Sequence, residues 1–242
     1  VSVASGSDAA KNVSHIVLMD NNFSNMPNVV FEGRRVINNI QNSSSLYLMK
    51  TLFTTIFAII SIILQQVYPF KTNNMMLMEM FVIGVSSFFL SLQPNKSRVR
   101  GKYLPYVLSR TIPCAIVLVL AVESTHIVNI FVPEYFGSHL QEMSVVIITF
   151  AGLVMLYRVC SPLNLYRTVL LLAMCACCIL GLTILPTMFF GDGYASLDFV
   201  SILYIIVVVM LCVPLSGIFI KLFDRLREGK KNEDPHGLPL RG

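Results

Sequence analysis

The sequence predicts an all-α polytopic membrane domain of six transmembrane helices, preceded by an incomplete α/β unit. Of the 242 residues, 55% are hydrophobic and 13% are charged, whereas soluble domains contain about 45–50% apolar and about 25% charged residues. One helical crossing of a bilayer core takes roughly 20 apolar residues, and six runs approach that length. The runs are Leu46–Leu64, Met75–Leu92, Leu104–Val122, Met143–Tyr157, Thr168–Thr187 and Phe199–Ile220.

The beginning of the chain differs in kind from these runs. Val1–Ala4 alternates as a short strand, and Ser7 is a good N-cap for a following helix. A second strand, Ile16–Met19, stops at the turn signature Asp20–Asn22. A helix from about Asn25 then continues toward the first membrane run. This order indicates the end of an α/β unit with parallel strands, whose remaining strands we expect upstream of the chain.

The sequence thus divides into three parts: a cytosolic α/β remnant (1–45), a membrane domain (46–220) and a cytosolic tail (221–242). Neither Gly nor Pro occurs between Arg34 and Ser45. We therefore expect the last soluble helix to run unbroken into the first transmembrane helix, as a rigid link into the bilayer. The polar tail is expected to be a short helix followed by a disordered end.

The distribution of basic residues predicts that both termini face the cytosol, because Lys and Arg beside short loops resist translocation. The odd-numbered connections contain one basic residue, Lys71, and several acidic ones. The basic residues of the even-numbered connections and of the tail are Lys96, Arg98, Arg100, Lys102, Arg158, Arg167, Lys221, Arg225, Arg227, Lys230 and Lys231. We expect a multi-pass protein of a cell membrane, and we attribute the net charge of +5 to this topology and not to nucleic-acid binding.

The cysteines lie inside or at the edges of the apolar runs, and none is placed for an extracytoplasmic disulfide. Cys175, Cys177 and Cys178 have the tight spacing of a metal-site fragment. One continuous helix would spread their thiols around its axis, so we interpret them as small apolar residues. Pro113 and Pro214 fall inside apolar runs and are expected to kink their helices.

Glu79 is the only carboxylate inside any of the six runs. A charge at the centre of a membrane helix costs about 2.5–3.5 kcal/mol on insertion scales, so its presence calls for a reason. Hard cations prefer oxygen ligands, and we interpret Glu79 as a metal ligand on an ion path. Ser86, seven residues on, is expected to share its helical stripe. The alternative is a carboxylate close enough to the extracytoplasmic end to reach the interface.

The first run carries a small, polar face at spacings of three and four. Its members are Thr51, Thr54, Thr55, Ala58 and Ser61. We predict that this face meets the Glu79 face, with Thr51 and Thr54 as further ion-site residues. The competing interpretation is that these hydroxyls mediate helix packing or bond back to their own helix.

Four other polar residues receive plainer interpretations. Lys50 and Arg110 are expected to extend to the cytosolic interface. Glu123 and His126, at the outer boundary of the third run, are expected to be solvated loop residues.

Two stretches resemble P-type cation-transporting ATPases. GSDAAKNVSHIVLMDNNF (Gly6–Phe23), followed by EGRRVINNI (Glu32–Ile40), is similar to the end of the phosphorylation domain of that family, which has a HAD-like fold. MFVIGVSSFFLSLQPNK (Met80–Lys96) resembles the sixth transmembrane helix and following loop of a bacterial, calcium-pump-like branch. The resemblance implies that the six runs are transmembrane helices five to ten of a bacterial cytoplasmic-membrane pump.

The resemblance also implies ATP-driven cation transport through an aspartyl-phosphate intermediate, with Ca²⁺ as the first candidate cation. ATP and Mg²⁺ would bind to parts of the same polypeptide outside this chain, so the chain alone is expected to have no ATPase activity. Its partners would be the lipid bilayer, the rest of that polypeptide and the transported cation. Many members carry Asn, Asp or Glu on both the fifth and sixth helices, whereas the matching face here offers only hydroxyls on the fifth.

Two other function classes compete with a pump. A six-helix secondary transporter or channel without nucleotide chemistry commonly shows inverted repeats. We find no convincing repeat between the two halves, and residues 1–45 would have no role there. A non-transporting membrane scaffold would leave the carboxylate of Glu79 unexplained.

Overall fold

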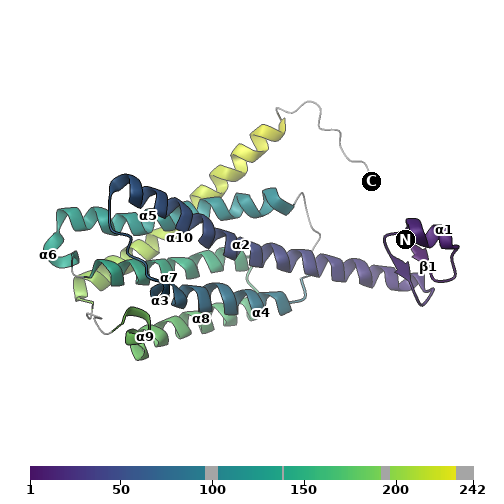
Figure 1. The fold of residues 1–242 in the computed structure, drawn as a ribbon, viewed down its shortest axis with the longest axis horizontal. Helices are drawn as coiled ribbons and strands as arrows, with labels where there is room; N and C mark the ends of the chain where they lie inside the picture. The colour runs from purple at the N-terminus through teal and green to yellow at the C-terminus, as the bar shows by residue number, and fades with distance from the viewer. Residues whose placement is uncertain (96–102, 138, 192–196, 233–242) are drawn as a thin grey trace.

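The computed structural model describes residues 1–95, 103–137, 139–191 and 197–232. Within these ranges, six helices are long and apolar enough to cross a membrane, which confirms the predicted number of crossings. They occupy Phe23–Ile63, Thr72–Leu92, Tyr103–Phe131, Leu140–Cys160, Leu165–Ile184 and Phe199–Arg225. Figure 1 shows them as an elongated bundle, with a small unit carrying the N-terminus at one end.

The small unit has the predicted order of strand, helix and strand. Strands β1 (Ser2–Val3) and β2 (Val17–Leu18) pair in parallel with each other. Helix α1 (Asp8–Val13) connects them in the chain. Ser7 caps α1, because its side chain accepts a hydrogen bond from the backbone N–H of Ala10. Leu18 is buried whereas Val13 is 83% exposed, so the unit has little core of its own among the described residues.

Helix α2 (Met26–Leu64) joins this unit to the bundle without a break, as predicted (Figure 1). A short 3₁₀ turn, η1 (Phe23–Asn25), precedes it. Pro27 lies in the first turn, where its missing N–H does no harm, and Gln65 ends the helix in the left-handed conformation. With 39 residues the helix is about 58 Å long.

The second crossing changes its winding along its length. Helix α3 (Thr72–Leu77) is followed by a π-helical segment, η2 (Met78–Val85), and then by helix α4 (Ser86–Leu92). π-helical turns bond each residue to the fifth along and occur frequently at functional sites.

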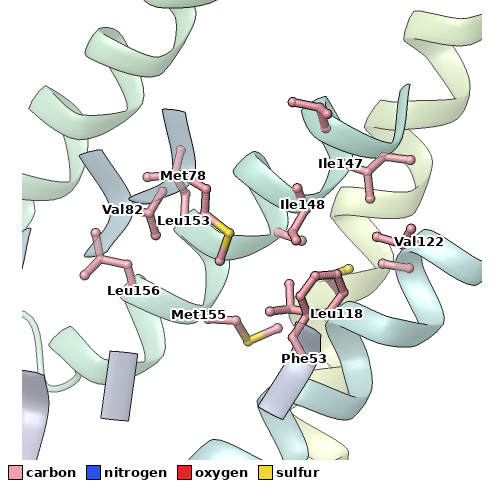
Figure 2. Close-up of a cluster of buried hydrophobic side chains, with 14 of the residues drawn as sticks. Phe53, Met78, Val82, Leu118, Val122, Ile147, Ile148, Leu153, Met155 and Leu156 are labelled. Carbon is pink, nitrogen blue, oxygen red and sulfur yellow. The ribbon is translucent and has the colours of Figure 1, made fainter. Parts of the chain in front are cut away.

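The remaining helices complete the bundle. They are α5 (Tyr103–Phe131), α6 (Pro133–Phe136), α7 (Leu140–Cys160), α8 (Leu165–Ile184), α9 (Pro186–Phe190) and α10 (Phe199–Asn232). Helix α7 is the central one, since it contacts α2, α5, α8, α10 and η2. In Figure 2 its side chains meet Phe53 of α2, Leu118 of α5 and Met78 of η2.

Two expectations about element ends need correction. Helix α5 continues past Val122 to Phe131, so Glu123 and His126 are helical and buried, not solvated loop residues. Neighbouring polar groups and the Phe57 ring cover them at the end of the bundle. The tail begins as a continuation of α10 to Asn232, while its last residues and the basic residues Lys96, Arg98, Arg100 and Lys102 lie outside the described ranges.

Candidate functional site

Lys50 of α2 and Glu79 of η2 form an ion pair between the first and second crossings. The ammonium Nζ donates to the Oε1 atom of the carboxylate. The Lys50 side chain is 28% exposed and the Glu79 side chain is 46% exposed. This pairing, in which a carboxylate on the neighbouring segment compensates the charge of Lys50, was not predicted from the sequence.

The two residues meet because the connection between α2 and α3 folds back along α2. The ring of Phe70 lies 5.8 Å from that of Phe53 and 5.6 Å from that of Phe57. Phe57 is about 10 Å before the end of α2 at Leu64, so the second crossing starts well inside the bundle. Figure 1 shows this connection leaving the end of α2 for α3. Non-helical backbone is tolerated at such a depth where protein covers it, and Phe70 is buried.

The π-helical winding separates Glu79 from Ser86. On an α-helix a spacing of seven returns to the same stripe, but the wider turn of η2 does not. Ser86 is fully buried and its hydroxyl donates to the carbonyl of Phe81, at 2.7 Å, whereas Glu79 is partly exposed. The shared stripe expected from the sequence is therefore wrong. Gly84 suits this winding, since a Cβ there would lie 3.2 Å from the Glu79 carbonyl oxygen.

The threonines of α2 bond back to their own helix. The hydroxyl of Thr51 donates to the Tyr47 carbonyl at 3.1 Å. That of Thr54 lies 3.1 Å from the Lys50 carbonyl and 3.0 Å from that of Thr51. The structure thus brings Glu79 to Lys50, while the hydroxyls of Thr51 and Thr54 bond to the α2 backbone.

A second polar cluster lies where the connection, α2 and α5 meet. The side-chain amide of Gln66 donates to the carboxylate of Glu123 at 2.8 Å. His126, one helical turn on, packs its ring 6.0 Å from that of Phe57, and its Nε2 atom is buried without a hydrogen-bond partner. The sequence signal for this cluster was an acid and a histidine three residues apart, which is a helical spacing. The signal was missed because both residues follow Val122, where the apolar run was taken to end.

At Lys50 and Glu79, a cationic and an anionic side chain neutralise each other. A carboxylate inside a bundle attracts a cation, and here the lysine ammonium takes that position. Within the described ranges, no group of three His, Cys, Asp or Glu side chains is placed to hold a metal ion. A metal cation at Glu79 would therefore need the ammonium to move away and other oxygens to take part.

Curated proteins similar in sequence transport cations. Over 138 residues the chain is 35% identical to "Calcium-transporting ATPase CtpE" of Mycolicibacterium smegmatis, which covers 53% of this chain and 17% of that protein. Over 179 residues it is 27% identical to "Probable cation-transporting ATPase exp7" of Streptococcus pneumoniae, which covers 70% of this chain and 23% of that protein. The homologues of this chain are P-type cation-transporting ATPases. No protein-family model matches the chain.

The predicted likeness to P-type ATPases is thereby confirmed. A CtpE protein from Mycobacterium tuberculosis gives a similar match, 34% identical over 137 residues. The chain spans about a fifth of the length of these P-type ATPases, since the matches cover 17% to 23% of them.

Lys50 is the residue of the candidate site that sequence reasoning did not include. Like Glu79, it is a charge within an apolar run. That signal was present, but two charges on different runs can be paired only when their relative depth is known. The back-folded connection sets that depth.

Proposed function

We propose that this chain forms the membrane part of an ATP-driven cation pump, with its ion path beside Glu79. The observation that carries the proposal is the unbroken helix α2, which follows the small unit in the chain and contains Lys50. A continuous helix transmits displacement because bending or breaking it costs hydrogen bonds. The P-type ATPase homologues support the same assignment.

The proposed coupling acts on the ion pair. Movement of the small unit displaces α2, and this displacement shifts the Lys50 ammonium relative to the Glu79 carboxylate. When the ammonium withdraws, the carboxylate accepts a transported cation, and when it returns, the cation is expelled. Thr51, Thr54 and Ser86 are proposed to supply further oxygens after local rearrangement, since hard cations take several oxygen ligands.

The small unit is proposed to be the end of a HAD-like phosphorylation domain. Its two parallel strands and exposed Val13 suit a larger sheet that supplies neighbouring strands. ATP and Mg²⁺ would bind to other parts of the same polypeptide, so we expect the isolated chain to hydrolyse no ATP.

The proposed location is a bacterial cytoplasmic membrane, with both ends of the chain in the cytosol. Arg158, near the end of α7, and Arg167, near the start of α8, flank a short connection. Basic residues at such a connection favour the cytosolic side. This orientation also puts the small unit on the side where ATP is present.

Ca²⁺ is the first candidate cation, because the relatives from mycobacteria are named calcium-transporting ATPases. The carboxylate of Glu79 is a suitable hard ligand for it. ATP-dependent uptake of radioactive Ca²⁺ into inverted vesicles that contain the full-length protein tests the assignment directly.

In this assay Glu79→Gln is expected to weaken the apparent cation affinity by about tenfold or more, because the charged ligand is lost. Glu134→Gln is the matched control, since Glu134 is exposed on α6 and should leave the affinity unchanged. Unchanged affinity in both Glu79→Gln and Glu79→Ala would exclude Glu79 from the ion path. Uptake that follows an ion gradient and ignores ATP would instead identify a secondary transporter or channel.

A further inference from the structure

Two neighbouring cavities lie at the end of the bundle opposite the Gln66–Glu123 cluster. One, of about 170 Å³, is lined by residues of α2, α5, α7 and α10. The other, of about 140 Å³, lies beside α2, α5 and the start of α8. Both are lined by Arg110, Val159 and Ser161. One water molecule needs about 10–15 Å³ of free space, so each cavity has room for more than a single water.

Every charged residue that lines these cavities is an arginine. Arg110 and Arg158 line the first, and Arg110 and Arg167 line the second. None of the three takes part in the ion pairs between described residues. The closest acidic residue on α10, Asp224, lies one turn beyond the lining residue Ile220 and is exposed.

The guanidinium groups are held in place by neutral partners. Arg158 donates through Nε to the Ser216 hydroxyl at 3.0 Å and through Nη2 to the Val213 carbonyl at 2.5 Å. Arg167 is buried, and it donates through Nε to Gln93 Oε1 at 2.7 Å and through Nη1 to the Cys160 carbonyl at 2.9 Å. A guanidinium has more N–H donors than these bonds use, so both side chains keep donors for a ligand.

Arg110 and Gln41 also line these cavities with unused hydrogen-bonding capacity. The guanidinium of Arg110 stacks 4.8 Å from the Tyr106 ring, and no hydrogen bond to another described residue is recorded for it. Gln41 lines the second cavity, is 4% exposed, and its buried Nε2 donor has no partner. An unpaired buried donor is unfavourable, and so is an uncompensated charge inside a membrane segment. Residues with unused donors therefore line these cavities, and an acceptor with negative charge would satisfy them.

We infer that these cavities form a binding site for a phosphate-bearing anion, of the kind that an anionic lipid headgroup carries. Guanidinium groups match phosphate oxygens in geometry as well as charge. Basic pockets between transmembrane helices on the cytosolic side bind anionic headgroups, and the basic connections predict that side for these arginines. The site is separate from the Lys50–Glu79 pair and does not depend on the proposed transport function.

Lipid binding to the full chain, purified in a zwitterionic detergent, tests the inference. Short-chain phosphatidylglycerol, short-chain phosphatidylcholine and inorganic phosphate are titrated separately, with native mass spectrometry and the thermal unfolding midpoint as readouts. Phosphatidylglycerol is expected to bind at least about tenfold more tightly than phosphatidylcholine, and Arg110→Gln is expected to weaken it by about tenfold, as for one lost charge-assisted hydrogen bond. Arg225→Gln is the matched control, because Arg225 is exposed outside the cavities.

A second variant keeps every charge. A Cβ at Gly217 would lie 2.9 Å from Nη2 of Arg158, so Gly217→Ala displaces that guanidinium and should also weaken phosphatidylglycerol binding. The midpoint without ligand reports whether each variant folds. Equal binding by inorganic phosphate, lost in the same variants, would support the anion site and assign it to a free anion. Equal affinity for the two lipids, or binding unaffected by Arg110→Gln and Gly217→Ala, would overturn the inference.

Discussion

At the scale of single residues, the pairing of Lys50 with Glu79 gives two membrane charges a joint explanation. Each charge alone is unfavourable in a bundle, and each compensates the other. The ammonium thereby occupies the position of a cation at the carboxylate. In the proposed pump, Lys50 acts as a built-in competitor of the transported ion.

Replacing Lys50 by Met should therefore raise the apparent cation affinity in ATP-dependent uptake. An increase of about tenfold corresponds to about 1.4 kcal/mol of relieved competition. The same variant should unfold at a lower temperature without the cation, because Glu79 loses its partner, and addition of the cation should restore the midpoint. Lys71→Met is the matched control, since Lys71 is exposed and outside the pair. Identical affinities in the two variants would contradict the competitor role.

Sequence reasoning singled out Glu79 as a membrane charge whose presence calls for a reason, but it did not find Lys50 as its ion-pair partner. It also assigned Glu123 and His126 to a solvated loop at the outer boundary of the third run, although both are buried in α5. Burial of these residues depends on Gln66 and Phe57, which lie far away in the sequence. A count of local apolar residues contains no such information.

At the scale of elements, α2 connects the small unit to the bundle, and in the proposed pump it transmits movement between them. It runs as one helix from the small unit to the far end of the bundle (Figure 1). The absence of Gly and Pro between Arg34 and Ser45 was sufficient to predict this continuity, because helix breaks depend mainly on local sequence.

A proline in this stretch tests the coupling. Val36 is half exposed in α2, ahead of the bundle core, and Val36→Pro removes a backbone donor and kinks the helix, at about 3 kcal/mol or more. We expect ATP hydrolysis by the full-length protein to continue in part while cation uptake falls to background. Val36→Ala keeps the helix and should keep both activities. Normal uptake in the proline variant would show that a straight α2 is unnecessary.

The winding of η2 is the element that sequence periodicity misjudged. The spacing of Glu79 and Ser86 suits an α-helix, and the π-helical turns change which residues share a face. Gly84 marked the position, since its missing Cβ gives room to the Glu79 carbonyl. Glycine has many uses in membrane helices, so this signal alone does not predict a π-helix.

At the scale of the whole molecule, the bundle is organised around α7. In the most apolar 18-residue stretch of α7, 78% is buried. The corresponding buried share is 28% in α2 and 22% in α10. Figure 2 shows side chains of α7 facing those of α5 on one side and Met78 and Val82 of η2 on the other. The position of η2, and with it that of Glu79, therefore depends on packing against α7.

Gly152 of α7 is the point of closest approach to η2. A Cβ there would lie 3.3 Å from Val82 Cγ1 and 3.4 Å from Met78 Cε. Gly152→Val should lower the stability by about 1–3 kcal/mol through overpacking, observed as a lower thermal unfolding midpoint. At Gly33 of α2 nothing lies within 4 Å of an added Cβ, so Gly33→Ala should instead stabilise its helix by about 0.5–1 kcal/mol. A similar midpoint for Gly152→Val and the unmodified chain would mean that this contact is not tight.

Local sequence was enough to predict six apolar helices of membrane-spanning length, the strand–helix–strand unit and the continuity of α2. These properties depend on composition and spacing within one segment, where the hydrophobic effect and backbone sterics act locally. Tertiary structure decided that residues 65–71 fold back along α2, that Lys50 meets Glu79, and that three arginines gather around shared cavities. Each of these outcomes requires side chains from distant segments to lie at the same depth, and packing of the whole bundle sets that depth.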